Sequence, residues 1–134
     1  MRNILLIDDN AHFRFSVCKV LRENNFHVIE AENSYTSWHL AQEQYPDLIL
    51  CDLDTPQING YEVLKKLRED SITAKIPVIF LTSSTDDYYR LKALELGANL
   101  WIRKPVDIRD LLQTIAIQLD TPITNGLLIK KSSL

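Results

Sequence analysis

The sequence lacks the features that mark membrane and secreted proteins. Nowhere does it contain the roughly 20 consecutive apolar residues that a membrane span needs. The apolar run after Arg2 is short and ends at two acids, so it predicts a strand rather than a secretion signal. We therefore expect a protein of the cytoplasm that makes no membrane contact.

Cysteine is scarce, and neither sign of charge dominates. Cys18 and Cys51 lie far apart and in no metal-binding spacing, which favours buried thiols in a reducing compartment. The formal net charge is −3 and the sequence has no basic stripe, so we expect no nucleic-acid binding. The adjacent lysine pairs at 65–66 and 130–131 are expected on the solvated surface.

What the chain does have is an ordinary globular balance, with 46% hydrophobic and 25% charged residues over 134 positions. This length fits one domain, which buries roughly two thirds of the surface of its unfolded chain. A core of that size needs neither a disulfide nor a metal to fold.

Two sequence patterns alternate along the chain. Short apolar runs predict strands at 3–8, 27–31, 47–52, 77–82 and 99–104. Longer segments of helical period predict helices at 11–24, 34–44, 60–69, 86–96 and 107–119. Ser34 is the expected N-cap of the second helix and Gly97 the expected C-cap of the fourth. In the third helix, Arg68 falls outside the apolar face.

This alternation predicts a parallel sheet with helices on both faces. The runs at 48–51 and 78–81 are apolar throughout, as doubly covered central strands are, whereas 27–31 alternates and suits a sheet edge. The likeliest fold class is α/β, a flavodoxin-like, doubly wound, five-stranded sheet of order 2-1-3-4-5 with five helices. Its switch point places a site at the carboxyl ends of the first and third strands.

Polar residues follow four of the five expected strands. Asp8 and Asp9 end the first strand and Asp52 the third, while Thr82-Ser83 and Lys104-Pro105 end the fourth and fifth. In the predicted fold these carboxylates, hydroxyls and one ammonium converge at one end of the sheet. Clustered carboxylates repel one another, so they need a cation or some of them must be protonated. Oxygen ligands suit Mg²⁺. Phosphoryl transfer to a carboxylate needs that positive charge, with Lys104 and the Thr82 hydroxyl as further donors.

These residues resemble the receiver domain of two-component response regulators, in particular single-domain regulators of the chemotaxis type. The resemblance covers residues 3 to about 119. It rests on an acid pair after the first strand, an Asp after the third with Pro and Gly four and eight positions later, a Thr after the fourth and Lys-Pro after the fifth. The residues that match are Asp8-Asp9, Asp52, Pro56, Gly60, Thr82 and Lys104-Pro105.

The resemblance implies a role for each matching residue. Asp52 would accept the phosphoryl group from a sensor histidine kinase or a phosphotransfer protein. Asp9 would bind Mg²⁺ directly and Asp8 through a coordinated water, with Asp52 and the backbone carbonyl of Asp54 as further ligands. Thr82 would swing toward the phosphoryl group and Lys104 would pair with it, across a Lys104-Pro105 bond expected to be cis. Such a domain is no enzyme beyond catalysing its own phosphorylation and dephosphorylation.

The family also has an aromatic switch residue, which corresponds here to Trp101. It would follow Thr82 inward and change the face made by the fourth helix, fifth strand and fifth helix, which contacts a downstream protein or a second copy. A half-buried strand position is the other interpretation of Trp101. Tyr88 and Tyr89 are further contact candidates on that face.

This chain departs from the family pattern at four positions. Thr55 stands where Met is frequent and Ser83 where Ala is frequent, and Trp101 is bulkier than the usual Tyr or Phe. Asp54 adds an acid at a position where family members vary and where the rate of dephosphorylation is tuned.

Two other functions remain open from the sequence. The stretch "DLDT" at 52–55 also resembles the nucleophile motif of haloacid dehalogenase-type phosphatases, but a complete strand with its own acid pair precedes it and no second acidic motif follows Lys104. The other alternative is a receiver-like interaction module that works without phosphorylation.

The receiver is expected to span residues 1–120. Residues 121–134 contain a Pro, an Asn-Gly and a Ser pair and resemble a tail or truncated linker. We expect either a regulator that stands alone or a receiver cut from a longer protein.

Overall fold

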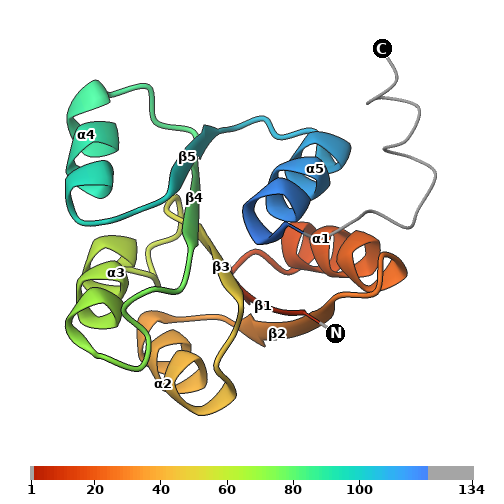
Figure 1. Ribbon diagram of the computed structural model, residues 1–134. Helices are drawn as coiled ribbons and strands as arrows, with labels where there is room; N and C mark the ends of the chain where they lie inside the picture. The colour runs from red at the N-terminus through yellow and green to blue at the C-terminus, as the bar shows by residue number, and fades with distance from the viewer. Residues whose placement is uncertain (1, 121–134) are drawn as a thin grey trace.

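The computed structural model describes residues 2–120, and the tail expected at 121–134 lies outside the described residues. Five parallel strands form one sheet at the centre of the molecule (Figure 1). The strands are β1 (Asn3–Ile7), β2 (His27–Ala31), β3 (Leu48–Asp52), β4 (Val78–Thr82) and β5 (Leu100–Arg103). Each lies within the predicted segment, and the predicted bounds exceed the observed ones by at most a residue at either end.

Helices connect successive strands, and the last helix follows β5. They are α1 (Ala11–Glu23), α2 (Ser34–Gln44), α3 (Gly60–Glu69), α4 (Asp87–Glu95) and α5 (Ile108–Leu119). Helices α1 and α5 cover one face of the sheet, and α2, α3 and α4 cover the other (Figure 1). The strand order is β2-β1-β3-β4-β5, which confirms the predicted doubly wound fold and the edge position of 27–31.

The strands explain why both faces are covered. β3 and β4 are buried at every position, and their side chains alternate between two cores because successive residues of a strand point to opposite faces. Leu48 and Leu50 pack toward α1 and α5, in a cluster with Leu21 and Leu112. The intervening side chains join a second cluster under α2 and α3, with residues Ile49, Cys51, Val63, Leu64 and Leu67.

Each of the helices α1 to α5 is preceded by an Asn or Asp whose side chain accepts a backbone N–H of the first turn. These N-caps are Asn10, Asn33, Asn59, Asp86 and Asp107. The expected N-cap Ser34 is therefore wrong by one residue. The Ser34 hydroxyl instead accepts the backbone N–H of Asn59 (2.7 Å) and joins the start of α2 to the start of α3.

The C-terminus of α4 follows the prediction closely. Its C-cap is Leu96, and the expected Gly97 lies one position further, with a φ of 105°. Glycine suits this left-handed conformation, which other residues adopt only with strain.

Arg68 lies off the apolar face of α3, yet its side chain is half-buried. Its guanidinium donates to the carbonyls of Gly97 (2.8 and 3.1 Å), Ala74 (3.1 Å) and Ile76 (2.7 Å) and to the side chain of Asn99 (3.1 Å). These acceptors lie in the loops that lead into β4 and β5. We call this side of the molecule, where the strands begin, the amino end of the sheet.

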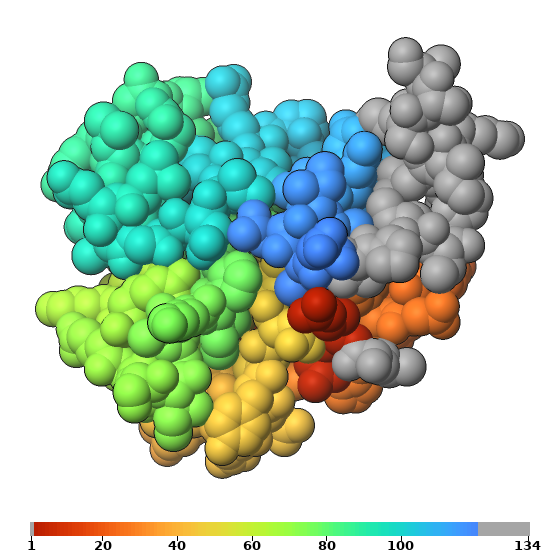
Figure 2. All heavy atoms as spheres, viewed as in Figure 1, coloured from red at the N-terminus to blue at the C-terminus, as the bar shows by residue number. Residues whose placement is uncertain are grey.

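Figure 2 views the molecule from this amino end. The last turn of α5 lies beside the start of β1, where Arg2 donates a hydrogen bond to the Leu119 carbonyl (3.2 Å). Asp47 accepts the backbone N–H of Asn3 (2.7 Å) at the same end. Across residues 2–120, none of the helices has both the length and the apolar character needed to cross a membrane.

Candidate functional site

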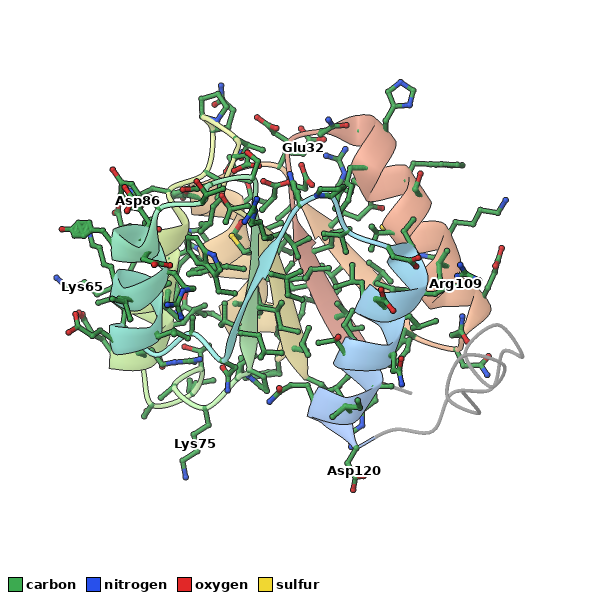
Figure 3. All side chains as sticks on the ribbon, turned by 90° about the horizontal axis from the view of Figure 1, so that it is seen from above. Glu32, Lys65, Lys75, Asp86, Arg109 and Asp120 are labelled. Carbon is green, nitrogen blue, oxygen red and sulfur yellow. The ribbon has the colours of Figure 1, made fainter. Side chains whose placement is uncertain are left out.

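The opposite side, where the strands finish, is the carboxyl end of the sheet. Figure 3 labels Glu32 and Asp86 at this end, and Lys75 and Asp120 at the amino end. The sheet ladder continues into the loops here, since the backbone N–H of Lys104 donates to the carbonyl of Thr82 (2.8 Å). This pairing holds the residues that follow β5 beside the end of β4.

Asp52 lies at the centre of this region. It is the last residue of β3 and its side chain is buried. One carboxylate oxygen, Oδ2, forms an ion pair with Nζ of Lys104. The other, Oδ1, accepts the backbone N–H of Asp54 (2.7 Å). The structure thus brings together Asp52 and Lys104, which the sequence predicted to meet across 52 positions.

Asp8 is a second buried carboxylate beside Asp52. Its Oδ1 accepts the backbone N–H of Asn10 (2.8 Å), but its Oδ2 is buried without a hydrogen-bond partner. Burial raises the pKa of Asp8 to about 6, and the negative charge of Asp52 adds to the rise. A buried carboxylate oxygen with no donor is costly, and the charge of Lys104, which acts to lower the pKa of Asp8, offsets only part of the rise.

Asp9 follows at a half-buried position on the same rim. Arg14 does not supply the missing charge, because its guanidinium donates to the backbone carbonyl of Asp8 (2.7 Å) and pairs with Glu30 (3.0 Å) and Glu32 (3.3 Å). The side chain of Asp8 therefore receives no compensation from this cation.

Asp54 occupies an unexpected position. The Thr82 hydroxyl donates to its Oδ1 (2.7 Å), the Ser83 backbone N–H donates to its Oδ2 (2.8 Å), and Lys104 Nζ lies 3.3 Å from Oδ2. Burial alone would raise the pKa of Asp54, but these hydrogen bonds and the lysine charge outweigh burial and lower it. The sequence predicted a metal ligand in the backbone carbonyl of Asp54 and an added acid at this position, but not these contacts of its side chain.

Lys104 balances the two carboxylates. Burial acts to lower the pKa of its ammonium group, but the contacts with Asp52 and Asp54 overcome this effect and raise it. The ammonium also lies 5.4 Å from the centre of the Phe13 ring, which is a cation–π distance. Phe13 lies in α1 and also packs against the core under α1 and α5. The bond between Lys104 and Pro105 is cis, as expected.

Two buried threonines lie at this end of the sheet. The buried Thr82 hydroxyl, besides donating to Asp54, accepts the backbone N–H of Ser84 (3.1 Å). Thr55 is also buried, and its hydroxyl oxygen has no hydrogen-bond partner. The sequence offered no sign of this burial, because Thr55 lies between Asp54 and Pro56 in the loop after β3.

A pocket of about 230 Å³ adjoins Thr82. Asp54, Thr82 and Trp101 line it together with Leu53, Tyr61, Ser84 and Tyr89. Trp101 is half-buried in β5 and packs against the core under α2 and α3, so the expected strand position is confirmed. A larger pocket of about 420 Å³ lies between α2 and α3, beside Trp38, and contains none of the site carboxylates.

The residues fit a hard cation held partly by water. No cluster of three or more His, Cys, Asp or Glu side chains arranged to hold a metal occurs within residues 2–120. Magnesium needs no such cluster, since it commonly uses one or two carboxylates and keeps several waters. The unpartnered Oδ2 of Asp8, next to Asp52, is a carboxylate oxygen of the kind that such an ion takes.

The fold and the site together define a class of protein: a doubly wound α/β domain with a lysine-paired aspartate at the carboxyl end of its central strand. The model of the response regulator receiver domain matches residues 4–116 of this chain. The chain therefore belongs to the receiver domain family, and its function is that of a receiver in two-component signalling.

Two curated relatives illustrate the range of proteins that contain this domain. The phosphate regulon transcriptional regulatory protein PhoB of Escherichia coli strain K12 is 38% identical over 114 residues, covering 85% of this chain and 50% of PhoB. Protein PilH of Pseudomonas aeruginosa is 32% identical over 115 residues, covering 86% of this chain and 95% of PilH. This chain thus spans about half the length of the PhoB relatives.

A solved structure gives the same fold. The CheY-like response regulator receiver domain protein of Methanospirillum hungatei superposes with a TM-score of 0.83 at 27% identity, covering 90% of this chain and 94% of that one. The family match also decides against the phosphatase alternative left open by the "DLDT" stretch.

Proposed function

We propose that Asp52 is the phosphoacceptor of this receiver. The observation that supports the proposal most is its setting: a buried carboxylate at the end of a central strand, paired with Lys104 and adjacent to Asp8, one of whose oxygens has no hydrogen-bond partner. Such a carboxylate is oriented by fixed donors before any phosphodonor arrives, and fixed donors lower the barrier to phosphoryl transfer.

In the proposed reaction, a carboxylate oxygen of Asp52 bonds to phosphorus of a phosphohistidine on a histidine kinase or phosphotransfer protein. The phosphorus–nitrogen bond breaks, the imidazole keeps the electron pair, and its nitrogen takes up a proton. Lys104 then moves from a carboxylate pair to the more negative acyl phosphate. Thr82 turns its hydroxyl toward a phosphoryl oxygen.

The Mg²⁺ ligands in this proposal are the carboxylates of Asp9 and Asp52, the backbone carbonyl of Asp54 and, through water, Asp8. When bound, the ion supplies positive charge to the phosphoryl oxygens and to the carboxylates around them. Asp8 would act through a coordinated water, which could donate to the carboxylate oxygen that has no hydrogen-bond partner.

The output of the site is proposed to run through Trp101 to the face made by α4, β5 and α5. The pocket that joins Thr82 to Trp101 gives the ring room to respond when the hydroxyl moves. Tyr88 and Tyr89 are 61% and 45% exposed on α4 and are available to a protein partner or a second copy. Aromatic side chains are enriched at such interfaces.

We propose that the reaction takes place in the cytoplasm, where Cys18 and Cys51 would stay reduced. The domain would catalyse only its own phosphorylation and dephosphorylation, within residues 1–120. The effect of phosphorylation on the complete protein depends on its partners, since this chain matches only half of the PhoB relatives.

Intact-mass measurement tests the proposal. The chain is incubated with acetyl phosphate, with and without Mg²⁺, beside Asp52→Asn and a matched carboxylate variant at the amino end, Asp47→Asn. We expect an Mg²⁺-dependent phosphate adduct on the wild type and on Asp47→Asn, and none on Asp52→Asn. No adduct, together with phosphate release no faster than in Asp52→Asn, would contradict the proposal and favour an interaction module that works without phosphorylation.

A further inference from the structure

The Asp54 carboxylate is held by three donors of different kinds. They are the Thr82 hydroxyl (2.7 Å), the Ser83 backbone N–H (2.8 Å) and the Lys104 ammonium (3.3 Å). We call these three groups the donor cradle. They come from the ends of β4 and β5, whereas Asp54 reaches them from the loop after β3, so the carboxylate bridges three strands.

A hydroxyl, a backbone N–H and an ammonium that converge on one carboxylate make a binding site for an anion. A phosphoryl group attached to Asp52 would need donors of the same kinds for its oxygens. Lys104 is already shared between the two anions, since its ammonium pairs with Asp52 and with Asp54. The donors that a phosphoryl group would use are thus engaged before it arrives.

The backbone ties Asp54 to the acceptor site. Its N–H donates to Asp52 Oδ1 (2.7 Å), so its side chain begins next to the carboxylate that would carry the phosphoryl group. Two anions at such close range repel each other, and neither can share every donor with the other. The Asp54 side chain is about a quarter exposed and has solvent to turn into.

We propose that the Asp54 carboxylate is an internal competitor of the phosphoryl group, which occupies the donor cradle in the unmodified protein and leaves it when Asp52 is phosphorylated. This inference rests on the proposed function of Asp52. It makes Asp54 a positioning residue that holds Thr82 in the unphosphorylated arrangement and sets the cost of switching. Removing its charge opens the cradle in advance.

The test is an equilibrium titration with fluoroberyllate, which bonds to a carboxylate oxygen and carries fluorines where a phosphoryl group carries its oxygens. Saturating Mg²⁺ is present throughout, and the absence of hydrolysis separates affinity from dephosphorylation rate. The variants are Asp54→Asn, which keeps the shape and loses the charge, and Asp54→Ala, which empties the cradle. Glu32→Gln is the matched control, because it removes one charge at the same end, outside the cradle (Figure 3).

We expect both Asp54 variants to bind fluoroberyllate more tightly than the wild type, Asp54→Ala by roughly tenfold. In these variants the ligand no longer has to displace the Asp54 carboxylate from its charge-assisted contacts with the donor cradle. Glu32→Gln is expected to stay within about twofold, since an exposed charge has little effect. Damage to the structure would weaken binding, so tighter binding cannot come from misfolding.

Two failures are distinguishable. If the wild type binds fluoroberyllate and both Asp54 variants bind equally or more weakly, the inference is overturned while the function of Asp52 stands. If neither the wild type nor any variant binds, and Asp52→Asn is indistinguishable from the wild type, the proposed function falls and takes the inference with it.

Discussion

The two ends of the sheet each contain a half-buried cation, and the cations are used in opposite ways. At the amino end, Arg68 donates to backbone carbonyls and to Asn99, all of which are neutral acceptors. At the carboxyl end, Lys104 divides its charge between Asp52 and Asp54, and Asp8 remains without a partner for one oxygen. The first arrangement satisfies every group involved, and the second leaves charge uncompensated.

The difference indicates that the amino end of the sheet stabilises the fold and that the carboxyl end destabilises it. A satisfied network adds to the free energy of unfolding, whereas buried like charges lower it. A site that binds an ion needs charged groups of this kind, because only groups without a full set of partners in the protein can form new contacts with the ion. Variants at the two ends should therefore change stability in opposite directions.

The largest effect is expected at Arg68. Arg68→Ala removes the donors of three carbonyls and one side-chain amide, so the free energy of unfolding should fall by roughly 2–4 kcal/mol. Urea unfolding measures this loss. Arg109→Ala is the control, since Arg109 is exposed and its contact with Asp107 (3.7 Å) should be worth less than about 0.5 kcal/mol. Equal losses in the two variants would show that the Arg68 network is not structural.

The opposite sign is expected at Asp8. In a chelator at pH 7, Asp8→Asn should raise the free energy of unfolding by roughly 1–3 kcal/mol, because it removes a buried negative charge next to Asp52 and keeps the oxygen that accepts the Asn10 N–H. Asp47→Asn, the matched change at the amino end, should lower it by about 1 kcal/mol. Urea unfolding of the two variants measures both changes. If both substitutions lowered the free energy of unfolding, the expected contrast between the two ends of the sheet would be contradicted.

The pH dependence of stability sharpens the same contrast. The pKa of Asp8 is about 6 in the folded protein and 3.8 is its ordinary value, so the folded state binds the proton more tightly than the unfolded one. In the metal-free protein, the contribution of Asp8 to the free energy of unfolding should be greatest below about pH 4. It should fall as pH rises to about 6. Asp8→Asn should lack this fall. Thermal unfolding between about pH 4.5 and 7 in chelator measures it, and identical slopes would contradict the prediction.

The smallest effect concerns Trp101, which lies at the border between the site and the α4–β5–α5 face. Trp38→Phe leaves Trp101 as the single tryptophan of the chain. We expect its fluorescence to change when acetyl phosphate and Mg²⁺ are added, because the ring lines the pocket beside Thr82. The same variant with Asp52→Asn added should show no change. Unchanged fluorescence in the phosphorylated protein would remove Trp101 from the switch.

The fold and most of the site could be predicted from the sequence because both follow from regular periods. Short apolar runs and helices of period 3.6 predict the topology, and the topology alone brings the residues after four strands to one end. The meeting of Asp52 and Lys104 needed no knowledge of loop geometry, since each lies directly at the end of its strand.

Contacts made by loops could not be predicted in this way. The acceptors of Arg68 come from segments up to 31 positions away whose carbonyls point inward only in the folded chain. Asn33 and Ser34 both suit an N-cap, and only the contact of Ser34 with Asn59 decides between them. The hydrogen bonds that the Asp54 side chain accepts from Thr82 and Ser83 likewise depend on the conformation of the loop after β3.

The most direct test of the account is to locate the modified residue. The chain is incubated with acetyl phosphate and Mg²⁺, the acyl phosphate is trapped by borohydride reduction, and the peptides are sequenced by mass spectrometry. The account predicts a single reduced residue at Asp52. Modification at Asp8, Asp9 or Asp54 instead, or reduction at no aspartate of the carboxyl end, would contradict it.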